Sequence, residues 1–184
     1  MAPLSFSSKM QSSNLVVRPE APADAIGVRR VHELAFGQPD EATLVDDLRQ
    51  DPSYVAELSI VGEVDGEIIA HILLTVGGLP GRRDWTPVLL LAPMAVLPKY
   101  QNMGIGSFLL ERAIAACKQS GRADFVVVVG HPNYYARFGF VAAETFGIMV
   151  PFSVPPQSVM VLRLGFIIPE PGVIMYPSPF GFLR

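Results

Sequence analysis

The segment from Val88 to Val129 constrains the fold most, because it combines two strand patterns, a glycine-rich turn and a helix pattern. Residues 88–96 and Phe125–Val129 are apolar, β-branched runs, and each is expected to form a buried strand. Between them, residues 104–120 carry apolar side chains at helical spacing, and Gly121 ends the predicted helix. The buried face of this helix is expected to hold Leu109, Leu110, Ala113, Ile114 and Cys117.

The first half of the chain predicts two helices and a hairpin. Asp65-Gly66, a dipeptide suited to a type I′ turn, joins two strand patterns at 58–64 and 67–76. Residues 16–18 are a short strand candidate, and helices are expected at 22–36 and 40–48. The apolar side of the first helix comprises Ile26, Val31, Leu34 and Ala35, and Asp40 is expected to cap the second.

The remaining segments complete the layout. Residues 77–87, rich in Gly, Pro and Arg, are expected to form a loop, and 131–138 one or two helical turns. Residues 140–143 and 159–164 are candidate closing strands. A helical pair, a hairpin and then strand–helix–strand indicate a single α/β layer domain with a mixed sheet.

Three segments are expected along the chain. Residues 1–14 are Ser-rich and are expected to be a disordered tail. The domain itself should span 15–165. Residues 166–184 combine four prolines with apolar side chains, so this extension is expected to pack on the domain or on a partner subunit, which leaves a homodimer possible.

Composition excludes several classes of protein. The formal net charge of −3 argues against a nucleic-acid partner, because such proteins neutralise phosphates with excess Lys and Arg. A lone cysteine, Cys117, rules out an intrachain disulfide, and the longest apolar stretch is far below the ~20 residues of a membrane helix. The cytoplasm is therefore the expected location. His32 and His71 show no spacing that indicates a metal site.

The turn before the predicted helix has the features of an anion site. It comprises Gln101, Asn102, Met103, Gly104, Ile105, Gly106 and Ser107. The first N–H groups of a helix have no internal acceptor, and the helix dipole places partial positive charge there. Gly104 and Gly106 leave room for a phosphate to reach the backbone.

Two familiar phosphate-binding motifs do not fit this turn. A P-loop requires a Lys and a Ser or Thr directly after its last glycine, and no Lys stands directly after Gly106. A dinucleotide-binding fingerprint requires a third glycine where this chain has Leu109. Its acidic residue should end the next strand, whereas Asp124 precedes it.

The turn and its flanks resemble the GNAT acetyltransferases, whose acyl-CoA loop has the pattern [QR]-x-x-G-x-[GA]. Gln101, Gly104 and Gly106 match that pattern, and residues 91–101 resemble the family's fourth strand and following turn. Downstream, Tyr135 stands four residues before Gly139-Phe140, as in the family's late motif. The resemblance covers roughly residues 15–165, and the wording G-H-P-x-Y-Y-x-R-F-G-F is most similar to a YhbS-like branch of predicted N-acetyltransferases.

The resemblance implies a GNAT-like α/β (α+β) fold with a mixed, mostly antiparallel central sheet, splayed central strands and helices on both faces. It implies that Met94, Ala95 and Val96 line the pantetheine arm of acetyl-CoA beside a bulge at Pro93, where a backbone N–H would face the thioester oxygen. The loop from Gln101 to Ser107 would hold the pyrophosphate.

The resemblance further implies that the chain transfers an acyl group, most simply acetyl, directly to a primary amine of a small molecule or peptide. Tyr135 corresponds to the general acid of that reaction. The base is not identifiable: His131 is a candidate, although an ordinary loop histidine is the simpler interpretation. Cys117 is interpreted as a core residue.

Two other functions are compatible with the same residues. One is a noncatalytic acyl-CoA-binding or regulatory domain, and the other is an interaction module whose apolar C-terminal extension forms a dimer surface. The presence of Tyr135 favours the enzyme.

Overall fold

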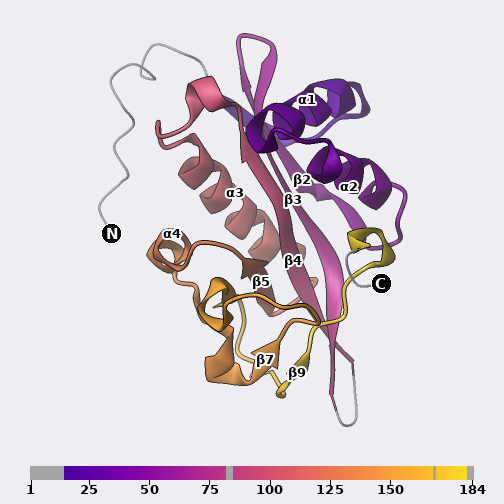
Figure 1. Ribbon diagram of the computed structural model, residues 1–184, viewed down its shortest axis with the longest axis vertical. Helices are drawn as coiled ribbons and strands as arrows, with labels where there is room; N and C mark the ends of the chain where they lie inside the picture. The colour runs from indigo at the N-terminus through magenta and orange to yellow at the C-terminus, as the bar shows by residue number, and fades with distance from the viewer. Residues whose placement is uncertain (1–14, 82–84, 168, 182–184) are drawn as a thin grey trace.

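The protein is built on a central mixed sheet with helices on both faces (Figure 1). The computed structural model describes residues 15–81, 85–167 and 169–181. Within these residues the main sheet has seven strands in the order β1-β2-β3-β4-β5-β8-β6. The pair β4–β5 is parallel and the other neighbours are antiparallel, which confirms the predicted mixed, mostly antiparallel sheet.

The elements of the described residues follow the predicted order. The strands are β1 (Val16–Pro19), β2 (Tyr54–Val64), β3 (Glu67–Pro80), β4 (Trp85–Val96), β5 (Phe125–Val129), β6 (Val141–Ala142), β7 (Ile148–Met149), β8 (Val159–Arg163) and β9 (Gly172–Val173). The α-helices are α1 (Ala25–Phe36), α2 (Asp40–Leu48), α3 (Ile105–Ser120) and α4 (Pro132–Tyr135). Short 3₁₀ turns include η1 (Pro22–Asp24), η2 (Pro98–Tyr100), η3 (Ala136–Phe138), η4 (Ala143–Phe146), η5 (Pro156–Ser158) and η6 (Ser178–Phe180). None of the helices in the described ranges is both long and apolar enough to cross a membrane.

Helices α1 and α2 cover one face of the sheet and α3 covers the other (Figure 1). His71 of β3 contacts His32 of α1, whereas its neighbour Ala70 pairs with Gly62 in a region of β2 that packs against Leu109 of α3. Consecutive residues of a strand point to opposite faces, so the two helical layers lie on opposite sides. The predicted tail, residues 1–14, lies outside the described residues.

The prediction of a loop at 77–87 is wrong, because strand β3 continues to Pro80 and strand β4 begins at Trp85. The glycines of this segment are sites of close packing, not of chain reversal. A Cβ on Gly78 would lie 1.7 Å from the ring of Trp85, and one on Gly77 would lie 2.5 Å from Leu90. Gly78 also exchanges two backbone hydrogen bonds with Met175 of the C-terminal extension. The extension thus contributes to this sheet edge from far along the chain.

The other hairpin turn matches its prediction. Asp65 and Gly66 have φ values of 49° and 82°, and a type I′ turn requires positive φ at both positions. Helix α2 begins at Asp40 as expected, but its N-cap is Pro39, and no side chain caps it. The predicted capping role of Asp40 is therefore wrong.

The buried face of α1 differs from the predicted one. Val28, Val31 and His32 are buried, whereas Ile26 and Leu34 are 84% and 50% exposed. The reason is that the polar side chain of His32 occupies a core position. A hydrophobicity pattern assigns such a residue to the surface, which rotates the expected face of the helix.

His32 is buried because it belongs to a chain of hydrogen bonds beneath α1. Arg49 pairs with Glu20 at 2.7 Å, and Glu20 accepts a hydrogen bond from Ser59. The Ser59 hydroxyl lies 2.9 Å from Nε2 of His71, and Nδ1 of His71 lies 2.8 Å from Nε2 of His32.

The charges along this chain fix the direction of its hydrogen bonds. Burial alone would raise the pKa of Glu20, but hydrogen bonds from His71 and Ser59 outweigh it and lower the pKa to about 2, so Glu20 is a carboxylate. Because the Ser59 hydroxyl donates to Glu20, its oxygen accepts from Nε2–H of His71, which also faces the Glu20 carboxylate at 3.5 Å. Nδ1 of His71 then accepts from Nε2–H of His32. Both imidazoles are neutral in this arrangement.

Acidification should destabilise the protein through these two histidines. Burial lowers the pKa of His32 from 6.5 to about 3, and burial also lowers the pKa of His71. Below pH 6.5 the unfolded chain takes up protons that the folded chain excludes, so stability is full above that pH and is lost as pH falls toward 3. Urea unfolding at stepped pH, followed by circular dichroism, should show the loss. A His32→Leu variant should lose less stability over the same interval, and an unchanged profile in that variant would contradict the assignment.

Candidate functional site: a cleft where β4 and β5 separate

Strands β4 and β5 separate part of the way along the sheet. Their pairing ends at Leu91 and Val128, although β4 continues to Val96. The β3–β4 register shifts at the same place, so two residues of β4, Ala92 and Pro93, face one of β3. Pro93 has no N–H to donate, and a bulge bends its strand. The peptide bond between Ala92 and Pro93 is cis.

A cleft of about 720 Å³ opens where the strands separate. It lies between the end of β4, the loop before α3 and the segment that follows β5. Its walls are formed by Met94, Ala95, Val96, Tyr100, Gln101, Asn102, Gly104, Ile105, Gly106, Ser107, Gly130, His131, Tyr134, Tyr135 and Arg137. Of the residues expected to form a site, only Met103 is missing from these walls, and its side chain packs against the core.

The loop before α3 is shaped by two left-handed residues. Asn102 has φ 60° and Gly104, the N-cap of α3, has φ 87°. The side-chain amide of Gln101 donates to the carbonyl of Val96 at 2.9 Å, which ties the loop to the end of β4.

The first turn of α3 presents free N–H groups to the cleft. The N–H of Phe108 donates to the carbonyl of Gly104, so the N–H groups of Ile105, Gly106 and Ser107 precede the first helical hydrogen bond. They and the helix dipole favour an anion at this position.

Tyr135 forms the opposite wall. It is 8% exposed, and its ring stacks edge-on against Phe140 with centroids 5.4 Å apart. Burial raises the pKa of Tyr135, and the neighbouring Tyr134 raises it further. The phenol therefore keeps its proton at neutral pH. A Cβ on Gly130 would lie 2.5 Å from the Tyr135 ring, so this glycine makes room for it.

Sequence reasoning missed Tyr134 and Arg137 as residues of this cleft. The Tyr134 hydroxyl is buried, has no hydrogen-bond partner of good geometry in the described part of the chain, and points toward the first turn of α3. Arg137 stacks on the Tyr134 ring at 4.9 Å. The spacing Tyr-x-x-Arg on a helical segment places the two side chains together, which was the available signal.

Other titratable side chains near the helices take different positions. His131 lines the cleft and is exposed, whereas Asp40 and Glu41 line a separate pocket beside Phe180. Glu33 pairs with Arg29 at 3.0 Å. Cys117 is fully buried, and burial raises the pKa of its thiol to about 12, so it is a core residue as predicted and no nucleophile. No cluster of metal ligands occurs among the described residues.

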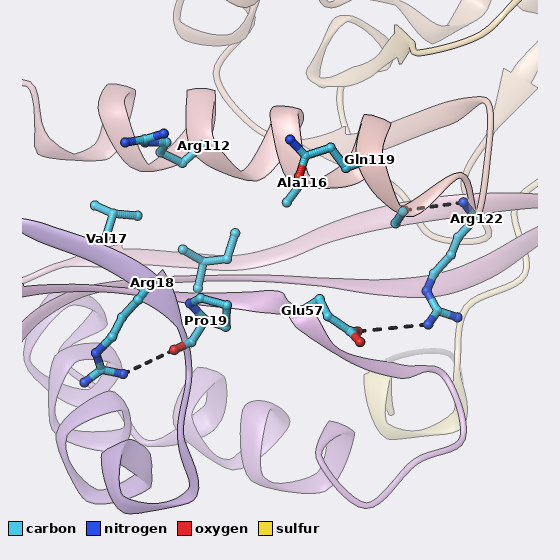
Figure 2. A pocket seen from close by; sticks show the side chains of 10 residues that line it. Val17, Arg18, Pro19, Glu57, Arg112, Ala116, Gln119 and Arg122 are labelled. Atoms are coloured by element: carbon cyan, nitrogen blue, oxygen red, sulfur yellow. Dashed lines mark hydrogen bonds and ion pairs between the residues drawn. The ribbon is translucent and has the colours of Figure 1, made fainter.

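A second groove lies between α3 and the β1–β2 edge (Figure 2). Arg112 and Arg122 stand near its two ends, and Arg122 lies 4.0 Å from Glu57. No helix begins there, and its lining includes apolar side chains such as Val17 and Ala116. The groove therefore lacks the free N–H groups and the buried hydroxyls that distinguish the cleft.

Comparison with known proteins gives consistent matches. Residues 26–140 match the acetyltransferase (GNAT) family. The relative named "uncharacterized N-acetyltransferase YjhQ", from Escherichia coli K12, is 37% identical over 136 residues, which cover 73% of this chain and 75% of the relative.

Two solved structures cover nearly all of the chain. The GNAT family N-acetyltransferase YhbS from Escherichia coli, in complex with CoA, superposes with a TM-score of 0.84 and 25% identity, covering 92% of this chain and 93% of that one. A GNAT family acetyltransferase from Brucella melitensis, in complex with acetyl-CoA, superposes with a TM-score of 0.74 and 30% identity. The match covers 91% of this chain and 98% of that one. The resemblance found in the sequence is confirmed.

Replacing Gly130 by alanine should destabilise the protein. The added methyl would overlap the Tyr135 ring, which is held by Phe140 and cannot move freely, at a cost of about 1–3 kcal/mol. Gly106→Ala is the matched control, because its Cβ would meet only the Tyr134 hydroxyl at 3.3 Å and a Val96 methyl at 3.6 Å. Urea unfolding should separate the two variants, and equal stabilities would show that the Tyr135 ring is free to move.

Proposed function

We propose that this chain, which belongs to the acetyltransferase (GNAT) family, transfers the acetyl group of acetyl-CoA to a primary amine within a ternary complex. The observation that carries the proposal is the cleft itself. It joins an anion-binding helix start, a strand separated from its neighbour and a buried tyrosine in one continuous space. Acetyl-CoA has a pyrophosphate, an extended amide arm and a thioester in the corresponding order.

The residues of the cleft fit such a donor. The N–H groups of Ile105, Gly106 and Ser107 suit the pyrophosphate, and Gly106 leaves the close approach open. The edge of β4 from Met94 to Val96 is not paired with β5, so it can hydrogen-bond to the amides of the pantetheine arm. When bound, acetyl-CoA would supply the activated acetyl group.

Tyr135 supports the chemical step. Attack by a neutral amine on the thioester carbonyl forms the carbon–nitrogen bond and breaks the carbon–sulfur bond. The attacking nitrogen then releases a proton to water, and the departing thiolate needs one. Because burial raises the pKa of Tyr135 above that of a thiol, the phenol holds its proton until the sulfur requires it. A backbone N–H near the bulge would stabilise the oxyanion, a contribution of about 2.7–4 kcal/mol in other enzymes.

Acetyl-CoA should stabilise the folded protein. At 100 times Kd the gain is about 2.7 kcal/mol, which for a domain of this size corresponds to a rise in melting temperature of roughly 5–10 °C. Thermal unfolding with and without acetyl-CoA measures it, and no rise at saturating ligand would refute the proposal.

The variants Gly104→Glu and Gly121→Glu locate the ligand. Both glycines are left-handed and stand at opposite ends of α3. Glutamate should therefore strain the backbone at both positions, but it should remove the acetyl-CoA shift only at Gly104, where its charge repels phosphate.

Tyr135→Phe should lower turnover at preserved CoA affinity. Loss of a general acid typically costs roughly 100-fold in rate, whereas the ring that packs against Phe140 is retained. Release of free CoA thiol over a panel of primary amines measures turnover, and calorimetry measures binding. Full activity in the variant would assign the proton to another group. CoA binding without turnover on any amine in the parent protein would favour a noncatalytic acyl-CoA-binding domain.

A further inference from the structure

Arg137 is the arginine at the cleft, and its position is fixed from two sides. Its Nε donates to the carbonyl of Tyr134 at 3.3 Å, and Nη2 lies 3.4 Å from the Ser107 hydroxyl. The guanidinium also stacks on the rings of Tyr134 and Phe138, at 4.9 and 5.5 Å. Stacking and hydrogen bonds together hold the guanidinium beside the first turn of α3.

Within the part of the chain that the structure describes, this guanidinium has no carboxylate partner. Arg18, Arg29, Arg30, Arg49 and Arg122 each pair with Asp or Glu, but no ion pair of the described residues includes Arg137. The chain as a whole carries an excess of acidic residues, with a formal net charge of −3. An arginine that is held in place yet lacks a counterion is available to an external anion.

The groups around Arg137 converge on one point. Ser107 lies in the first turn of α3, so its contact with Arg137 places a full positive charge next to the free N–H groups. The Tyr134 hydroxyl is buried there beside Ser107, with no hydrogen-bond partner of good geometry among the described residues, and it lies 3.3 Å from where a Cβ on Gly106 would stand. A buried hydroxyl without a partner is costly, so a bound acceptor would satisfy it.

We propose that Arg137, stacked on Tyr134, pairs with the pyrophosphate of CoA at the first turn of α3, so that the free N–H groups and the guanidinium form a clamp around it. This proposal rests on the proposed function and adds a binding residue from outside the glycine-rich loop. A guanidinium presents several N–H groups in a fixed plane and can donate two hydrogen bonds to neighbouring phosphate oxygens. The Tyr134 hydroxyl supplies one further donor.

The pyrophosphate, not the 3′-phosphate of the ribose, is the group assigned to Arg137. The contact with Ser107 places the guanidinium at the first turn of the helix, the same position at which the free N–H groups gather. A phosphate bound by those N–H groups is therefore within reach of Arg137.

Calorimetry on the full chain tests the clamp with three probes: CoA, 3′-dephospho-CoA and pantetheine, the last by competition with CoA. Arg137→Gln should weaken the binding of CoA and of 3′-dephospho-CoA alike, by roughly 10- to 100-fold, and leave the affinity for pantetheine unchanged. The CoA affinity of Arg137→Lys should lie between those of the parent protein and Arg137→Gln, because lysine keeps the charge but not the planar guanidinium. The slope of log Kd against log salt should also be shallower in Arg137→Gln.

Arg112→Gln is the matched control. Arg112 also stacks on an aromatic ring, that of Phe108 at 5.3 Å, and is carried by α3, but it faces the second groove (Figure 2). The Arg112→Gln variant should bind all three probes with the affinities of the parent protein.

Each other outcome overturns the inference. Unchanged CoA affinity in Arg137→Gln would remove the residue from the site. A loss confined to CoA would assign it to the 3′-phosphate, and an equal loss for pantetheine would make it a structural brace only. If the parent protein binds none of the probes, the proposed function fails as well, whereas normal binding by both the parent and Arg137→Gln refutes the clamp alone.

Discussion

The separation of β4 from β5 is the constraint on which the site depends. A parallel pair that continued past Leu91 and Val128 would use the backbone groups of both strands in sheet hydrogen bonds, and no ligand could enter. Pro93 interrupts the donors of β4, and the shift in register against β3 turns the strand. Strand β5 meanwhile keeps its pairing with β8 as far as Val129. The cleft is thus formed by a sheet that stays intact on both sides of the gap.

The sequence predicted those parts of the fold that depend on local patterns. The helix start at Gly104, the turn at Asp65-Gly66 and the strand at Phe125–Val129 each follow from a few adjacent residues. The errors arose where distant residues decide the structure. Gly77 and Gly78 indicated a loop, but Trp85 and Met175 pack against them, and the strands β3 and β4 continue past this point.

The buried histidines beneath α1 are a second case in which distant residues, and not local sequence, decide the structure. His32 is polar, and nothing near it in the sequence indicates that His71, Ser59 and Glu20 will satisfy it. A polar group can occupy the core when its partners are provided, and the partners here come from three separate segments. The predicted face of α1 was therefore rotated, although the bounds of the helix were close to those of α1 and η1 together.

The segment from Tyr134 to Arg137 depends both on a local sequence motif and on contacts with residues far away in the sequence. Tyr134 and Tyr135 are consecutive, yet about 100° of rotation about the helix sends their rings to different walls. Tyr135 packs on Phe140 with its ring filling the space left by Gly130, while Tyr134 reaches across to α3 and supports Arg137. The family motif pointed to Tyr135, whereas Tyr134 and Arg137 reach the helix start only through side-chain contacts with the first turn of α3, at Gly106 and Ser107. In the proposed function, the proton donor Tyr135 and the phosphate-binding pair Tyr134 and Arg137 therefore lie within four consecutive residues of the chain.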